Sequence, residues 1–182
     1  MRTLLTLLLL STLPAFAQDP ASSPDDASRN VELLTKYYEH GKRNEIDQQV
    51  ALWSRDAINN GEKAKPEALR AALEDFRRTF PDYQSVVLEM RAVGDTVVAL
   101  SRISGTHQGV AQTNLFGGLL KGAKPTGKRY EALVTHWWRF RDGKIVWHQV
   151  TRDDLGILKQ LGLVPSTLAA DKLAVTTAVS KE

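Results

Sequence analysis

The sequence predicts one α+β domain in which a curved antiparallel sheet packs over about three N-terminal helices and leaves an internal pocket. Three observations lead to this prediction. Apolar residues recur at helical spacing up to Pro81. Stretches rich in β-branched and aromatic residues follow, with the alternation that is typical of strands. Asp142-Gly143 lies between two such stretches and is the strongest short-range signal for a β-hairpin.

The first residues have the pattern of a secretory signal. Arg2 precedes an apolar run that is too short to cross a bilayer, and Ala15-Phe16-Ala17 forms a small-x-small cleavage site. We therefore expect a secreted or periplasmic protein without stable membrane insertion. The next residues are polar and rich in Pro, Ser and Asp, which is typical of a disordered leader. The expected organisation is a signal peptide (1–17), a disordered leader (18–28), one domain (29–165) and a C-terminal tail (166–182).

Composition excludes several kinds of site. The chain has no cysteine, which excludes disulfides, thiolate zinc sites and a cysteine nucleophile. Its four histidines show no close ligand spacing, so we expect no metal. The formal net charge is +3 and the basic residues are scattered, so we expect no nucleic-acid partner. Phosphate-loop, nucleophile-elbow and dinucleotide motifs are absent from the sequence, which leaves chemistry without a cofactor.

Three helices are expected before the strands. Residues 30–40 carry an apolar stripe and end at Gly41, and residues 45–53 form a shorter helix with Trp53 on its stripe. Pro66 begins the clearest helix, which Pro81 closes. Its stripe, expected to pack beneath the sheet, consists of Leu69, Ala72, Leu73, Phe76 and Phe80.

Two hairpins are expected after the helices. Residues 83–93 and 96–107 flank a Gly94-Asp95 turn, and the second hairpin surrounds Asp142-Gly143. Mirror pairing across that turn places three pairs on one face, which continues to Asp153. The pairs on this pocket-side face are Phe140 with Ile145, Trp138 with Trp147, and His136 with Gln149. His148 is then expected on the opposite face, unless a bulge or a twisted strand end intervenes.

The run RFRDGKIVWHQVTRDDLGILKQLG (Arg139 to Gly162), preceded by GTHQG at 105–109 and PTGKR at 125–129, resembles the SnoaL-like polyketide cyclase (ester cyclase) family. This family belongs to the nuclear transport factor 2-like superfamily, so the resemblance implies a cone-shaped fold over residues 30–164. In the family the stretch before the final helix usually reads Glu-His-Trp, and here it reads Trp147-His148-Gln149.

Asp153 and His136 are the candidate catalytic residues. Asp153 matches an acidic position that the family uses as its acid/base, although it is equally well placed to cap the final helix. His136 lies in an apolar stretch, where a neutral, hydrogen-bonded core imidazole is the alternative to a role in steadying an oxyanion. The candidate substrate-binding residues are His107, Gln149, His148, Trp138 and Trp147.

Three functions remain open from the sequence. The first is an exported enzyme that acts on a small apolar or aromatic carbonyl compound by cofactor-free acid/base chemistry, as a cyclase or isomerase-type lyase. The second is a non-catalytic periplasmic module that binds a small molecule in the same pocket. The third is a dimeric scaffold, because a homodimer is expected through a half-buried sheet face. The residues predicted for that face are Trp137, Arg139, Val146, His148 and Val150.

Overall fold

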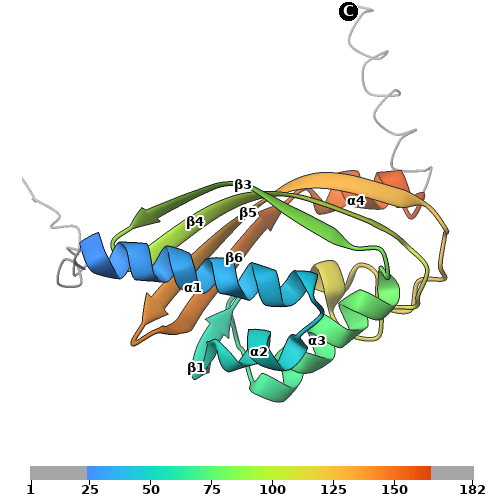
Figure 1. The fold of residues 1–182 in the computed structure, drawn as a ribbon. Coiled ribbons are helices and arrows are strands. Elements are labelled where there is room, and N and C mark those ends of the chain that lie inside the picture. The colour runs from blue at the N-terminus through green and yellow to red at the C-terminus, as the bar shows by residue number, and fades with distance from the viewer. Residues whose placement is uncertain (1–23, 165–182) are drawn as a thin grey trace, which may run out of the picture.

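The protein, seen in a computed structural model that describes residues 24–164, is a single α+β domain (Figure 1). A curved sheet of six strands lies over helices α1, α2 and α3, so the predicted fold class is confirmed. Within residues 24–164, no helix has both the length and the hydropathy needed to span a bilayer. The predicted signal peptide (1–17) and C-terminal tail (166–182) lie outside the described residues.

Within residues 24–164 the α-helices are α1 (Pro24–Lys42), α2 (Ile46–Ala51), α3 (Pro66–Thr79) and α4 (Asp154–Leu161). The start of α1 corrects the predicted leader, because Pro24 to Ser28 are helical. Pro24 suits a first helical turn, and Asp25 and Asp26 stabilise the positive end of the helix dipole. α1 packs against β3 and β4, so this long helix covers one side of the sheet.

The strands follow the order β2-β1-β6-β5-β4-β3 in the sheet. Their bounds are β1 (Trp53–Asn59), β2 (Glu62–Lys63), β3 (Gln84–Val93), β4 (Thr96–Thr106), β5 (Arg129–Arg141) and β6 (Lys144–Arg152). All pairings are antiparallel except that of β1 with β6, which is parallel and makes the sheet mixed. β1 was not predicted: the helix expected over residues 45–53 ends at Ala51, and Trp53 begins a strand.

The last hairpin turns where predicted but departs from mirror pairing after two residue pairs. Asp142 and Gly143 have φ values of 50° and 70°, as a type I′ turn requires. Arg141 pairs with Lys144 and Phe140 with Ile145, but Arg139 then pairs with Trp147. Val146 is the extra residue of a β-bulge. The predicted pairs Trp138 with Trp147 and His136 with Gln149 are therefore wrong, because the bulge exchanges the faces of β6 beyond it.

Two hydrophobic clusters make up the interior. One lies around Trp53 and Trp138, with Leu34 of α1 fully buried in it. The other lies around Phe80 and Tyr130 and includes α4 through Ile157. The loop before β5, which contains a short 3-10 helix (η1, Leu115–Gly118), joins this second cluster.

Candidate functional site

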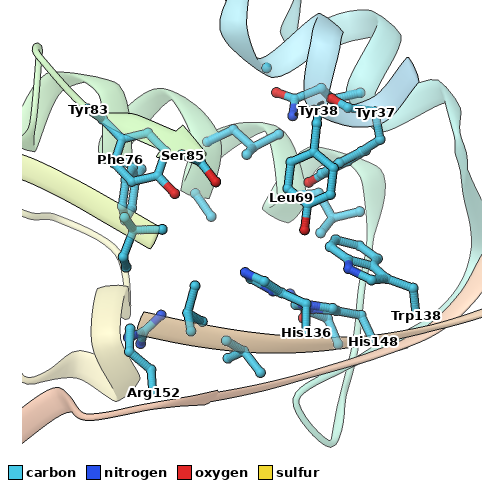
Figure 2. A pocket seen from close by; sticks show the side chains of 18 of the residues that line it. Tyr37, Tyr38, Leu69, Phe76, Tyr83, Ser85, His136, Trp138, His148 and Arg152 are labelled. Atoms are coloured by element: carbon cyan, nitrogen blue, oxygen red, sulfur yellow. Dashed lines mark hydrogen bonds between the residues drawn. The ribbon is translucent and has the colours of Figure 1, made fainter. Parts of the chain in front are cut away.

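A cavity of about 510 Å³ lies between the two hydrophobic clusters. Trp138 and Leu69 of the first cluster contribute to its wall, as do Ile103 and Val134 of the second. Figure 2 shows aromatic and aliphatic side chains around it, with His136 directed into the open space. Its volume falls in the range of small-molecule sites, and its mostly apolar wall suits a ligand with an apolar body.

Two histidines and an asparagine form a hydrogen-bonded chain along one wall of the cavity. His136 Nδ1 lies 2.9 Å from His148 Nε2, and His148 Nδ1 lies 2.7 Å from Asn59 Oδ1. His136 comes from β5, His148 from β6 and Asn59 from the end of β1. The bulge at Val146 and the parallel pairing of β1 with β6 bring these three residues together.

A backbone amide determines which atoms donate and which accept in this series of hydrogen bonds. Val150 N–H donates to Asn60 Oδ1 at 2.9 Å, so the other end of that side chain, Nδ2, donates to Asn59 Oδ1 at 3.1 Å. Because Asn59 presents its oxygen, His148 must donate from Nδ1, and its Nε2 accepts the proton of His136 Nδ1. His136 Nε2 is then left as an unprotonated acceptor, and Figure 2 shows its ring reaching into the cavity.

Burial keeps both imidazoles neutral. Desolvation, with a contribution from the Arg152 charge, lowers the pKa of His136 to about 4. Desolvation also lowers the pKa of His148 well below its ordinary value, and the neighbouring His136 and Arg152 add to this effect. The ring of Trp138 stacks on both histidines, at 5.7 Å from His136 and 3.9 Å from His148 between ring centroids. The chain of hydrogen bonds described above is therefore the arrangement at neutral pH.

Of the predicted site residues, His136, His148 and Trp138 line the cavity together. His148 was expected on the opposite face, and the bulge explains why it lies beside His136. Trp147 and Gln149 were expected in the pocket, but they pair with Arg139 and Trp137 on the other side of the sheet. The placement of both in the pocket was therefore wrong.

Asp153 does not line the cavity. It is exposed and is the N-cap of α4, where its Oδ1 accepts the backbone N–H of Gly156 at 2.8 Å. The predicted placement on the pocket-side face was wrong, because the bulge makes Arg152 rather than Asp153 the last residue of β6 to face the cavity. The alternative stated above, that Asp153 caps the final helix, agrees with its position in the structure.

His107 also lies away from the cavity. Its side chain is fully buried in the second cluster, with its ring centroid 5.8 Å from that of Phe80. Its Nδ1 lies 3.4 Å from Thr126 Oγ1, and its backbone N–H donates to Lys128 O. His107 therefore holds the loop before β5 against the end of α3, and its placement as a ligand contact was wrong.

Several lining residues carried no signal in the sequence. Asn59 and Asn60 are residue types common in turns. Their contact with His148 depends on a parallel pairing between distant strands. Arg152 could have been found only from a hairpin register that includes the bulge. In the part of the chain that the structure describes, no group of three or more His, Cys, Asp or Glu residues is placed to hold a metal ion.

A curved sheet over helices with an internal cavity defines a nuclear transport factor 2-like fold. The sequence profile of the SnoaL-like polyketide cyclase family matches residues 31–161, and the chain belongs to this family. This family suggests a small-molecule ligand, and the cavity has a volume in the range of small-molecule sites.

Solved structures with the same fold include proteins to which different activities are ascribed. The proposed hydroxylase AclR from Streptomyces galilaeus is 23% identical, with a TM-score of 0.62, over 76% of this chain and 99% of AclR. A proposed SnoaL-like polyketide cyclase from Jannaschia sp. CCS1 is 20% identical, with a TM-score of 0.64, over 82% and 100% of the two chains. No curated protein matches significantly. At these identities the likenesses show the fold alone.

Proposed function

We propose that the protein is an enzyme of the acid/base type that takes a small, mostly apolar carbonyl compound into the cavity and needs no cofactor. The observation that carries this proposal is the unprotonated Nε2 of His136, held toward the cavity by His148 and Asn59. A base whose conjugate acid has a pKa of about 4 is unprotonated at any physiological pH, as are the carboxylate bases of other enzymes that abstract protons next to carbonyls.

In the proposed reaction His136 Nε2 removes a proton from the carbon next to a carbonyl group. The enolate carbon attacks a second carbonyl of the same molecule, which forms a carbon–carbon bond and an alkoxide. The imidazolium then returns its proton to the alkoxide, so the net reaction is an isomerisation that closes a ring. Tyr38, whose ring centroid lies 6.4 Å from that of His136, is the candidate donor to the developing oxyanion. Burial raises the pKa of Tyr38 to about 12, which keeps its hydroxyl protonated.

A screen of small carbonyl compounds and aromatic polyketides by thermal shift, followed by turnover measurements on the compounds that bind, tests this proposal. His136→Gln should lower turnover by roughly 10² to 10⁴ while binding persists. Asp153→Asn is the matched control, because it changes a side chain outside the cavity and should leave turnover unchanged. Full turnover in His136→Gln would remove His136 from the mechanism.

Non-catalytic binding is the second candidate, and one observation favours it. No aspartate or glutamate of the described residues lines the cavity, so the carboxylate base of the family's usual chemistry has no counterpart there. The same screen separates the two candidates. Compounds that bind but are never converted, with equal affinity for the parent protein and His136→Gln, would favour a binding module over an enzyme.

We also propose that the protein is exported after removal of residues 1–17. The small-x-small pattern at Ala15 to Ala17 after a short apolar run supports this proposal. Intact mass of protein recovered from the exported fraction should correspond to a chain that begins at Gln18. Recovery of the chain from the cytoplasm with Met1 to Ala17 still attached would contradict it.

A homodimer through the sheet face opposite the cavity is the last part of the proposal. Leu133 and Trp137 on this face are 55% and 45% exposed, which is high for large apolar side chains. The bulge corrects the predicted interface, because His148 and Val150 line the cavity and Trp147 takes their place beside Arg139. Sedimentation velocity should give a dimer that Trp137→Glu converts to a monomer. Val93→Glu, at a more exposed apolar site (71%) at the tip of the β3–β4 hairpin, should leave the dimer intact.

A further inference from the structure

The charged side chains on the cavity wall are all basic. Lys42, Arg77 and Arg152 line the cavity, and no carboxylate does so among the described residues. Lys42 Nζ lies 2.8 Å from Glu39 Oε1, so its charge is compensated locally. The two arginines therefore determine the electrostatic character of the cavity.

Two of the three guanidinium nitrogens of Arg152 form hydrogen bonds within residues 24–164, and the third does not. Its Nε and Nη2 pair with the carboxylate of Asp154, and its Cζ lies 4.1 Å from the centroid of the Phe116 ring. The side chain is only 15% exposed to solvent. No hydrogen bond within residues 24–164 uses Nη1, so this nitrogen retains donors for a partner in the cavity.

Arg77 has no acidic partner within the described residues. Its Nη2 donates to the backbone oxygen of Gly41, and its Cζ lies 5.5 Å from the centroid of the Tyr83 ring. Its Nε and Nη1 make no hydrogen bond in the described part of the chain. A half-buried guanidinium without a counter-charge is unfavourable, and an anion in the cavity would relieve that cost.

Both arginines act on the same end of the cavity. Neighbouring aromatic rings connect them: Arg77 Cζ lies 5.5 Å from the Tyr83 ring centroid, and Arg152 Cζ lies 4.1 Å from that of Phe116. Phe76 packs between these two rings, with centroids 4.6 Å from Tyr83 and 5.9 Å from Phe116. Figure 2 shows Arg152, Phe76 and Tyr83 on one side of the open space and Trp138 and His148 on the other, with His136 between them. The cavity thus has a cationic end next to Phe76 and Tyr83, and an uncharged end next to Trp138 and His148.

We propose that Arg77 and Arg152 form an anion subsite, and that the ligand of this cavity is an apolar or aromatic compound bearing a carboxylate. The carboxylate binds between the two guanidinium groups, and the apolar body extends toward His136 and Trp138. This inference rests on the proposed ligand cavity and specifies its ligand class. An anion at this place also offsets the Arg152 charge that disfavours a protonated His136, so a bound ligand strengthens the base.

Matched probes test the subsite directly. The affinities of 2-naphthoate, methyl 2-naphthoate and 2-acetylnaphthalene for the full chain would be measured by isothermal titration calorimetry. These three compounds share one ring system and differ mainly in charge. We expect the acid to bind about tenfold or more tightly than the ester or the ketone. Equal affinities, tighter binding of the ester, or no measurable binding of the acid would each overturn the proposal.

Variants assign the selectivity to residues. Arg77→Gln and Arg152→Gln should each weaken binding of the acid by about tenfold and leave the ester unaffected. Arg141→Gln is the control, because it removes the same charge from an exposed site at the hairpin turn. If Arg152→Gln fails to fold because Asp154 loses its partner, Arg77→Gln and Arg152→Lys decide the question. Unchanged acid affinity in Arg77→Gln would exclude that residue from the subsite.

A further readout separates this proposal from the proposed enzyme function. Addition of 2-naphthoate, but not of its methyl ester, should raise the pKa of His136 in an NMR titration. Selective binding of the acid, together with no turnover of any carbonyl compound in the screen described above, would support the anion subsite and contradict the enzyme function. Turnover that depends on His136 but accepts uncharged substrates equally well would support the enzyme function and contradict the subsite.

Discussion

Trp138 and His148 are cross-strand partners whose rings stack with centroids 3.9 Å apart and an interplanar angle of 28°. This contact exists because Val146 is bulged out of the ladder, which moves His148 to the cavity side and Trp147 to the other. The stacking holds the His148 ring in the plane from which its two nitrogens reach Asn59 and His136. The bulge therefore determines both the packing and the polar geometry of the site.

Trp138→Ala should lower the free energy of unfolding by about 3 to 5 kcal/mol, because Trp138 is 2% exposed and packs in the first hydrophobic cluster. Trp137→Ala is the matched control: the same change at the next residue, on the opposite face and 45% exposed, should cost less than about 1 kcal/mol at protein concentrations too low for the proposed dimer to form. Urea titrations of both variants give the comparison. Equal losses would mean that the assigned faces of β5 are incorrect.

Stability should fall on acidification between about pH 6.5 and pH 4. The pKa of His136 is depressed in the folded protein, so the unfolded chain binds a proton more tightly and stability is lost as pH falls below the unfolded value. For His136 the loss is on the order of 3 kcal/mol. His136→Gln should show a shallower decline in urea titrations between pH 7 and pH 4.5. An identical slope in the variant would contradict the buried, neutral state of His136.

Asp75→Ala should destabilise the domain by about 1 to 3 kcal/mol by releasing the loop before β5. The buried Asp75 carboxylate accepts from Gln112 N, Thr113 N and Thr113 Oγ1 at 2.6 to 2.9 Å. Asp56→Ala, at a side chain that is 88% exposed, serves as the control and should change stability by less than about 0.5 kcal/mol. Hydrogen exchange of the loop amides should rise in Asp75→Ala. Unaltered exchange there would show that Asp75 does not anchor the loop.

The same carboxyl should add to acid sensitivity at lower pH. Burial alone would raise the pKa of Asp75, but the hydrogen bonds from Thr113 and Gln112 outweigh it and lower the pKa. A depressed carboxyl pKa contributes stability above its unfolded value, and this contribution disappears as pH falls through the folded value. Asp75→Ala should therefore unfold with a weaker dependence on pH below about pH 4.

Asp153→Asn should leave stability within about 0.5 kcal/mol of the parent, whereas Asp153→Ala should cost about 1 kcal/mol. The reason is that Asp153 caps α4 through Gly156 N–H, and an asparagine side chain can accept the same hydrogen bond. Thermal denaturation of both variants is sufficient to measure this. A large loss of turnover in Asp153→Asn would contradict the placement of Asp153 outside the site.

Local patterns in the sequence correctly predicted the structural elements that depend on residues close together in the chain. The Asp142-Gly143 turn, the helix that begins at Pro66 and the β3–β4 hairpin lie close to their predicted positions. Each of these depends on residues within a few positions, such as a turn dipeptide or the periodicity of one face. Even the first two residue pairs beyond the turn follow the predicted register.

The composition of the site could not be predicted in the same way. No feature of the sequence from Ile145 to Trp147 indicates the one-residue bulge. The bulge nevertheless determines whether the side chain of His148 or that of Gln149 faces the cavity. Asn59 reaches His148 through a parallel pairing of β1 with β6, which no local periodicity reveals. Asp153 illustrates the opposite case, because its capping signal was visible and proved to describe its place in the structure.

The parallel pairing of β1 with β6 also bears on the order in which the chain folds. Asn59 and His148 are 89 residues apart in sequence, so their contact closes one of the longest loops in the domain. β1 has no partner on that side until β6 has been synthesised and has joined its hairpin. We therefore expect the hairpins to form early and the docking of β1 to be the slow, rate-determining event of folding. A chain truncated before β6 would leave β1 as an open edge, prone to association with other chains.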